Sequence, residues 1–478
     1  MSTEIKFGTD GWRGIIALDF TFENVKRVAR GIVAYLLSEE RPKLKMYSWG
    51  VPLRGADKGI VVGYDRRFLS DEFAMAFSEE VAKYGIPVFL SKEPVPTPAV
   101  SYGVLLKNAS LGVMITASHN PPKYNGIKLK PEYGGPALPE VTSLIEKMLD
   151  ARLTQVSKPA PVFLVDLKNE YIEGLKRGVS LFSLSGLPFK VVVDVMYGSG
   201  EGVLSRVLDS INIEVEEIHA ETNPYFGGLH PEPIPPNTDG LSRAILQLRG
   251  DVGIVLDGDA DRIGLVDEEG NFVNPHQVFA LLMKHLIENR GKRGKVVWTC
   301  SLGREPEKLA EKYGIEYSIT PVGFKHICEH ILQGGVLLGG EESGGFGFVE
   351  HLPERDGSMS ALLILEMMSK KKKAIKELIK ELYIDFGPYY YKRLDLKLDK
   401  KVSFGQLKEL GAILYSLVNE YPVRVEDIDG LKLHFSDESW LLIRPSGTEP
   451  LLRLYCQAPS LERLDFLLEK AKEATLNV

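Results

Sequence analysis

Residues 251–262 read Asp-Val-Gly-Ile-Val-Leu-Asp-Gly-Asp-Ala-Asp-Arg, an apolar run followed directly by a loop with three carboxylates at alternate positions. The apolar part predicts a buried β-strand, because short β-branched runs bounded by turn-forming residues are typical of parallel sheets. The same design recurs twice: Thr116-Ala-Ser-His-Asn-Pro121 follows the predicted strand 111–116, and Gly340-Glu-Glu-Ser-Gly-Gly345 follows the predicted strand 335–339. In open α/β sheets, ligands bind at the carboxyl ends of strands. We therefore expect three similar units whose loops face one cleft.

The rest of the chain extends this pattern. Short strands alternate with helical stretches, which favours α/β layers with substantial parallel pairing. Residues 154–161 are typical of a linker, and a second break is expected near 267–270. After Phe386-Gly-Pro388 the segments alternate in the manner of antiparallel strands, and a helix is predicted over 461–474. The last part of the chain is therefore predicted to be a small, separate α+β domain.

Length and composition narrow the class of protein. The chain has 478 residues, enough for three or four domains at roughly 100–200 residues each. Its 58 Lys and Arg against 65 Asp and Glu give a formal charge of −7, which disfavours general nucleic-acid binding. Three distant cysteines exclude a disulfide framework and a structural zinc site. With no apolar leader and no apolar run near ~18 residues, we expect a cytoplasmic enzyme with no membrane segment.

The aspartate loop predicts a metal site. Asp257, Asp259 and Asp261 crowd three carboxylates into one tight turn, and Mg²⁺ commonly pairs carboxylates with substrate phosphate oxygens. An EF-hand is excluded, because Arg262 stands where its sharp turn needs glycine and a strand precedes the loop. An acidic surface turn is disfavoured, because three carboxylates behind a buried strand repel one another unless a cation lies between them.

Two further loops have chemistry that is less specific. Ser118 and His119 lie at a strand exit without the Gly-x-Ser-x-Gly frame of acyl-transfer enzymes, and by themselves they also fit an ordinary turn. Arg444-Pro-Ser-Gly-Thr-Glu-Pro450 combines a guanidinium, two hydroxyls and a glycine, which are the parts of a phosphate cradle. The carboxylates and hydroxyl of the 340–345 loop suit hydrogen bonds from sugar hydroxyls.

In this order, the four loops make the chain resemble the α-D-phosphohexomutase superfamily, whose phosphoglucomutases and phosphomannomutases interconvert sugar 1-phosphates and 6-phosphates. The resemblance runs from Phe7-Gly-Thr-Asp-Gly-Trp-Arg13 to the Arg444 loop. It implies three similar α/β/α domains with mixed, largely parallel sheets plus a smaller C-terminal α+β domain around one central cleft. The predicted domains are 1–158 with the phosphoserine, 159–268 with the metal, 269–386 with the sugar site and 387–478 with the phosphate site.

The resemblance also implies roles for individual residues. Ser118 would carry the transferable phosphoryl group, with His119 and Lys128 as acid–base residues. The Ser118 oxygen, Asp257, Asp259 and Asp261 would hold Mg²⁺. The implied substrate-binding residues are Thr9, Arg13, Arg262, Lys325, Glu341, Ser343, Arg444, Ser446, Gly447, Thr448 and Arg453. Among these, Glu341 and Ser343 would hold the sugar hydroxyls, and the loop that starts at Arg444 would hold the phosphate that does not react.

The expected reaction passes through a hexose 1,6-bisphosphate that turns end for end in the cleft. The expected partner is a phosphosugar, with no nucleic acid or membrane partner, and the chain is expected to be a monomer or homodimer. A Mg²⁺-dependent sugar phosphatase with an aspartyl nucleophile in the Asp257 loop is a competing class. A phosphosugar-binding regulator without catalysis is disfavoured, because the serine and aspartate loops are both intact.

Substrate preference depends on two positions of the 340–345 loop. Glu342 and Gly345 resemble the phosphoglucomutase version of this loop, whereas relatives that accept both sugars or glucosamine often carry another residue at 342 and histidine at 345. We therefore expect glucose phosphates to be preferred and mannose phosphates to be tolerated. Phosphomannomutase and phosphoglucosamine mutase remain open as alternatives.

Overall fold

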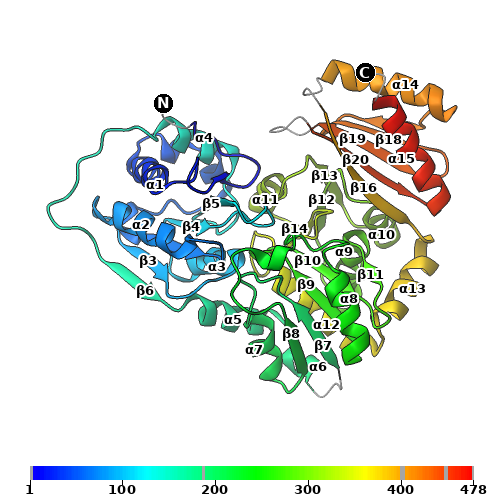
Figure 1. Ribbon diagram of the computed structural model, residues 1–478, viewed down its shortest axis with the longest axis horizontal. Helices are drawn as coiled ribbons and strands as arrows, with labels where there is room; N and C mark the ends of the chain where they lie inside the picture. Colours follow the sequence, from blue (N-terminus) through cyan, green and yellow to red (C-terminus); the bar gives the residue numbers. More distant parts are fainter. Residues whose placement is uncertain (1–3, 186–188, 399–403, 446–450, 476–478) are drawn as a thin grey trace.

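The structure is a computed structural model that describes residues 4–185, 189–398, 404–445 and 451–475. Figure 1 shows four bodies in chain order, with the N-terminal domain in blue at one end and the C-terminal domain in orange and red set to one side. In the part of the chain described here, no helix is long and apolar enough to cross a membrane.

The first sheet has six strands in the order β1-β5-β4-β2-β3-β6. Strands β4, β2, β3 and β6 run parallel, while β5 pairs antiparallel with both β4 and β1. Helices cover both faces, so the central strands are continuous apolar runs. The elements are β1 (Trp12–Ile15), α1 (Phe22–Leu37), β2 (Ile60–Tyr64), α2 (Ser70–Ala82), β3 (Val88–Ser91), α3 (Thr97–Leu106), β4 (Leu111–Ile115), β5 (Tyr124–Pro131), α4 (Pro139–Lys147) and β6 (Val162–Val165).

The second sheet has the order β11-β10-β9-β7-β8, with β8, β7 and β9 parallel and the other two strands antiparallel. Its elements are α5 (Leu167–Gly178), α6 (Leu181–Leu184), β7 (Lys190–Asp194), α7 (Val203–Asp209), β8 (Glu214–Ile218), α8 (Asp239–Leu248), β9 (Val252–Leu256), β10 (Ile263–Val266) and β11 (Phe272–Val273).

The third sheet has the order β13-β12-β14-β15, with only β15 antiparallel to its neighbour among these described strands. Its elements are α9 (Pro275–Lys284), β12 (Lys295–Thr299), α10 (Glu305–Tyr313), β13 (Tyr317–Thr320), α11 (Phe324–Gln333), β14 (Val336–Gly340), β15 (Phe346–Phe348), α12 (Gly357–Lys371) and α13 (Ile375–Phe386).

The expected threefold repeat is visible in these sheets. In each one a buried parallel strand ends in a loop and returns as an antiparallel neighbour: β4 to β5, β9 to β10 and β14 to β15. The three loops are those that carry Ser118, Asp257–Asp261 and Glu341–Gly345. The predicted fold class is confirmed.

The C-terminal domain is built differently, as an antiparallel sheet in the order β16-β20-β19-β18-β17. Its elements are β16 (Tyr390–Lys397), α14 (Phe404–Val418), β17 (Arg424–Glu426), β18 (Leu431–His434), β19 (Trp440–Pro445), β20 (Leu451–Ala458) and α15 (Leu461–Thr475). This domain has its own hydrophobic core, whereas one continuous core joins parts of the first three sheets.

The predicted domain boundaries stay predictions, and two strands lie just past them. β6 pairs with β3 although it follows the boundary placed at residue 158, and β11 pairs with β10 although it follows the one placed at 268. Sequence pattern alone missed this, because an edge strand that closes a sheet has the same local composition as one that opens the next.

Candidate active site

Ser118 lies in the loop that follows β4 and is completely buried. Its backbone φ of 53° is in the left-handed region, which residues with a Cβ seldom adopt. The hydroxyl donates a hydrogen bond to Asp257 Oδ2 at 2.9 Å, and Oγ lies 3.4 Å from His119 Nδ1. The serine predicted from the first domain is therefore in contact with the aspartate loop of the second.

The aspartate loop can hold a divalent cation. Asp257, Asp259 and Asp261 are fully buried, and one ligand oxygen from each lies within 4.8 Å of the others. Oδ1 of Asp259 and Oδ1 of Asp261 have no hydrogen-bond partner, and orphaned buried carboxylate oxygens are costly unless a cation is present. Hard oxygen donors of this kind suit Mg²⁺. The residues present therefore fit the predicted metal.

Lys128 supplies a positive charge to this corner from strand β5. Its ammonium lies 2.8 Å from Asp259 Oδ2, 2.7 Å from Asp261 Oδ2 and 3.0 Å from Asp10 Oδ2. Burial by itself lowers the pKa of Lys128, but these three carboxylates outweigh burial and raise that pKa above its usual value. Lys128 is therefore protonated at pH 7 in this arrangement.

His119 has the opposite character. Burial lowers its pKa well below the usual value, and the nearby Arg262 and Arg13 lower it further. The imidazole is therefore neutral at pH 7 and can accept a proton. Arg13 also donates a hydrogen bond to Asn120, which ties the first strand to the serine loop.

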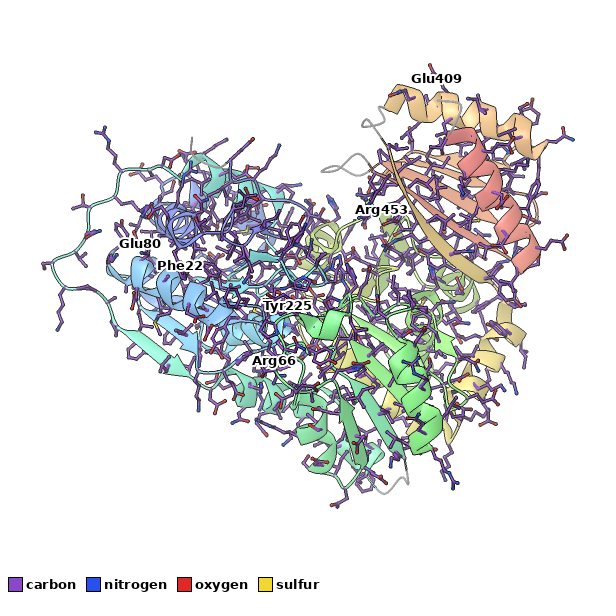
Figure 2. All side chains as sticks on the ribbon, viewed as in Figure 1. Phe22, Arg66, Glu80, Tyr225, Glu409 and Arg453 are labelled. Carbon is purple, nitrogen blue, oxygen red and sulfur yellow. The ribbon has the colours of Figure 1, made fainter. Side chains whose placement is uncertain are left out.

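A cleft of about 520 Å³ joins residues of all four domains. The predicted residues that line it are Thr9, Arg13, His119, Arg262, Lys325, Glu341, Ser343, Arg444 and Arg453. Ser118, Lys128 and the three aspartates lie behind its wall, at most 1% exposed. Figure 2 labels Arg453 at the edge of the C-terminal domain that faces the other domains. The fold thus brings the predicted residues from distant loops to one place, while their individual roles stay predictions.

The 340–345 loop, which carries the predicted sugar-binding residues, is fixed by contacts from two other segments of the third domain. Glu341 Oε1 accepts a hydrogen bond from the Gly323 amide at 3.1 Å, and Arg355 Nη1 lies 3.3 Å from Glu341 Oε2. Burial raises the pKa of Glu341 to about 7, with Arg355 opposing that rise. The adjacent Glu342 accepts a hydrogen bond from Ser301 at 2.5 Å. Both carboxylates are therefore oriented before any sugar binds.

The predicted phosphate-binding end of the cleft belongs to the C-terminal domain. Arg444 Nε donates to Asp429 Oδ2 at 2.8 Å, and the same oxygen accepts the Val322 amide at 3.0 Å from the third domain. Arg453 Nε lies 3.7 Å from Asp395 Oδ2. Three predicted residues of this end, Ser446, Gly447 and Thr448, lie outside the described residues.

Sequence reasoning missed two charged residues at the centre of the cleft. Arg355 pairs with Asp10 and lies 2.7 Å from Asp261 Oδ2, so it connects the N-terminal loop of Asp10, the aspartate loop and Glu341. Asp10 lies within the Phe7–Arg13 segment that carries part of the resemblance, so the sequence did contain a signal that could have identified it as a site residue. Arg355 sits in Pro353-Glu-Arg-Asp356, a stretch with no pattern that indicates a site.

Fold and site together define a class of protein, the α-D-phosphohexomutases. The chain belongs to the phosphoglucomutase/phosphomannomutase family. The models of its three α/β/α domains match residues 4–155, 169–270 and 274–386, and that of its C-terminal domain matches 399–474. The chain is a phosphohexomutase.

Individual relatives agree on the family but differ in described substrate. A phosphoglucomutase/phosphomannomutase of Thermococcus kodakarensis is 31% identical over 97% of this chain and 96% of its own. A phosphoglucosamine mutase of Limosilactobacillus reuteri is 30% identical over 97% and 96%. A crystal structure of a Thermus thermophilus protein, provisionally described as a phosphomannomutase, is 36% identical with a TM-score of 0.85 and covers 99% of this chain and 100% of its own.

Proposed function

We propose that this enzyme interconverts hexose 1-phosphates and hexose 6-phosphates, glucose phosphates preferred, through phosphorylated Ser118 and a hexose 1,6-bisphosphate. The observation that carries the proposal is the contact between the Ser118 hydroxyl and Asp257 at 2.9 Å, behind a cleft lined by arginines and lysines. Phosphoryl transfer depends mainly on positioning and charge stabilisation. These residues supply both for a dianionic substrate on a chain whose net charge is −7.

The reaction balances as two transfers. In the first, the P–O bond of phosphorylated Ser118 breaks and a P–O bond forms to the C6 hydroxyl of the 1-phosphate; that hydroxyl loses its proton and the Ser118 oxygen gains one. In the second, after the bisphosphate has turned, the P–O bond at C1 breaks and a P–O bond forms to Ser118; the Ser118 hydroxyl loses its proton and the C1 oxygen gains one. The product is the hexose 6-phosphate, and the enzyme is phosphorylated again.

We assign the two proton transfers to His119 and Lys128. His119 borders the cleft with its Nδ1 3.4 Å from Ser118 Oγ, so its position suits the base that removes the hydroxyl proton, although its lowered pKa makes it a weak one. Lys128 is held protonated by Asp10, Asp259 and Asp261 and is the candidate acid that returns a proton, although those carboxylates also make it a weak acid.

Asp257, Asp259 and Asp261 would hold Mg²⁺ together with an oxygen of the phosphorylated serine. When bound, the ion neutralises charge that develops on the transferring group. Lys128 and Arg355 already pair with the Oδ2 atoms of Asp259 and Asp261, which leaves the two Oδ1 atoms for the ion.

The preference for glucose is supported by the packing at Gly345. A Cβ on this residue would lie 2.3 Å from Cδ of Arg355, so the arginine occupies the room that a side chain at position 345 would need. A histidine at position 345 would therefore require Arg355 to move. Because Glu341 and Ser343 hold hydroxyls that glucose and mannose share, the C2 epimer is rejected only weakly.

The deciding experiment compares kcat/KM for glucose 1-phosphate, mannose 1-phosphate and glucosamine 1-phosphate, with glucose 1,6-bisphosphate present and released phosphate measured in parallel. We expect the highest value for glucose and no phosphate release. Glu341→Ala should lower the glucose and mannose values alike, whereas the exposed Glu350→Ala, from the same segment, should lower neither. Steady phosphate release in place of isomerisation would support the phosphatase instead.

A phosphoglucosamine mutase is the second candidate. The observation that favours it is the 30% identity to the Limosilactobacillus reuteri enzyme over nearly the full length of both chains. The highest kcat/KM for glucosamine 1-phosphate in the same assay would establish it and would overturn the proposed glucose preference.

A further inference from the structure

Arg67 is a buried arginine that the reaction described so far does not use. It follows strand β2, is 3% exposed, and belongs to none of the described residues that line the cleft. Its Nη2 donates to the carbonyl oxygens of Ser118 and Asn120, both at 2.6 Å. Its Nη1 donates to the carbonyl oxygens of Pro121 and Tyr124 at 3.0 and 3.1 Å. One side chain therefore holds four carbonyl groups of the serine loop.

Arg67 is itself held by two neighbours. Its Nε lies 3.3 Å from Asp65 Oδ2, and its guanidinium lies over the ring of Phe226, 4.7 Å from the ring centre, in the second domain. Asp65 Oδ1 also accepts hydrogen bonds from Ser70 Oγ at 2.7 Å and from the Arg67 amide at 3.0 Å, and its Oδ2 accepts one from Thr116 Oγ1 at 2.6 Å. The arginine thus has one defined orientation.

Asp65 and Arg67 together fix both the amide and the carbonyl group of Ser118, Asp65 acting through Thr116. The Ser118 amide donates to Thr116 Oγ1 at 2.8 Å, and that hydroxyl is bound to Asp65. The Ser118 carbonyl accepts from Arg67, which is paired with the same aspartate. A backbone with a φ of 53° is strained for serine and persists only where its surroundings hold it. This clamp is what holds it, with Oγ directed at Asp257.

We propose that Asp65 and Arg67 are positioning residues that fix the left-handed conformation of Ser118 and so align its oxygen with the metal loop during phosphoryl transfer. The inference rests on the proposed function of Ser118. Because Arg67 does not border the cleft, its loss acts on the transfer step and leaves substrate binding nearly unchanged. A lysine cannot replace it, since an ammonium is a point charge and the guanidinium offers a planar fork of donors to several acceptors at once.

The test compares two adjacent arginines. Arg66 is also largely buried and ion-paired, but its Nη1 donates to the Ala220 carbonyl at 2.6 Å and its Nη2 to Glu201 at 2.8 Å. Figure 2 labels it where the first and second domains meet. Arg67→Lys should lower kcat about 100-fold, the effect of a displacement of about 1 Å, with KM within about threefold of wild type. Arg66→Lys should leave both within about threefold.

Two further measurements separate positioning from loss of folding. Phosphorylation of Ser118 by glucose 1,6-bisphosphate, followed by intact mass, should slow in Arg67→Lys by the same factor as kcat while the melting temperature stays close to that of Arg66→Lys. Added guanidinium ion should partly restore kcat to Arg67→Ala and leave Arg66→Ala unchanged. If the Arg67 variants do not fold, Asp65→Asn and Thr116→Val test the same clamp and should lower kcat with KM preserved.

If the wild type is active and Arg67→Lys has the same kcat, the inference is overturned, whereas the proposed function still stands. Equal losses in Arg66→Lys and Arg67→Lys would also overturn it, because packing between the domains would then explain both. A wild type that is never phosphorylated at Ser118 would instead overturn the proposed function.

Discussion

Two regions of the proposed active site rest on different hydrophobic cores. One is the buried corner formed by Ser118, Lys128 and the aspartate loop, and the other is the proposed phosphate-binding wall with Arg444 and Arg453. Ser118, Lys128 and the three aspartates are fully buried above a hydrophobic core that runs through the first three sheets. Arg444 and Arg453 belong to a domain with a separate core, joined to the third domain by a small cluster around Trp440 and Cys300 and by polar contacts such as Lys432 to the Cys300 carbonyl at 2.7 Å.

This difference matches what each region has to do. The reacting groups need fixed positions, because a small displacement costs much of the rate. In the proposed reaction the phosphate that does not react arrives first on one end of the sugar and then on the other, so the residues proposed to hold it would have to accept two ligand orientations. A domain with its own core can adjust without disturbing the buried corner (Figure 1).

The largest effect should come from the nucleophile itself. Ser118→Ala should lower mutase turnover by more than about 1000-fold, because groups that act as one unit lose nearly everything when one is removed. Intact mass should show a phosphoryl group on part of the wild type and none on the variant. Ser101→Ala, which removes another buried hydroxyl of the same domain, should keep full activity. An active Ser118→Ala enzyme would remove the distinction between the two regions.

The metal loop should come next. Asp259→Asn removes one charge from the buried triad and should lower kcat about 100- to 1000-fold, since a metal supplies several kcal/mol of charge stabilisation. EDTA should abolish the activity of the wild type, and added Mg²⁺ should restore that activity. Asp267→Asn, a buried acid in a turn after β10 of the same domain, is the matched control and should keep its Mg²⁺ dependence. Full activity in EDTA would contradict the metal assignment.

On the phosphate-binding wall the expected change is in KM. Arg444→Lys loses a forked contact and should raise KM for glucose 1-phosphate about ten- to a hundredfold, as hydrogen bonds to charged groups contribute about 1.5–3 kcal/mol. The kcat should change far less. Arg463→Lys, in the same domain and paired with Glu420 and Asp437, is the control that should change neither. A drop in kcat with KM unchanged would place Arg444 with the reacting groups.

The smallest effect concerns the contact between the third and fourth domains. Burial raises the pKa of Glu305 to about 7 from an ordinary 4.5, although hydrogen bonds from Gln457 at 2.9 Å oppose that rise. The folded state therefore binds a proton that the unfolded state has lost, and the stability so gained is complete below pH 4.5 and is lost as pH rises through 7. Glu305→Gln should melt with the wild type at about pH 4.5 and a few degrees above it at about pH 8.

The control for that measurement is Glu350→Gln, which changes an exposed acid and should follow the wild type at both pH values. A melting difference between Glu305→Gln and wild type that does not grow with pH would show that Glu305 is ionised in the folded protein. Glu305 would then give the interface no pH dependence.

Much of the fold was predictable because its signals are local. Apolar runs such as 252–256 can only be buried strands, and each is followed by a loop too polar to enter a core. Three aspartates at alternate positions directly after a buried strand indicate a cation, because the carboxylates would otherwise repel one another. The antiparallel return strands after each loop were not predictable in the same way, because β10 and β15 are short and carry no alternation of their own.

By itself, the sequence indicated the three repeated units, the separate C-terminal domain and the candidate metal loop, because these follow from periodicity and from residue chemistry within a few positions. Ser118 was predicted only through the resemblance of the four loops to a family, and its contact with Asp257 was decided by the tertiary structure. Only the tertiary structure decided that Lys128 pairs with Asp10, Asp259 and Asp261 and is therefore held protonated. It alone also placed Arg355 beside Gly345 and Arg67 behind Ser118. The physical reason is that a charge is set by its neighbours in space, and those neighbours come from strands and loops that lie far apart along the chain.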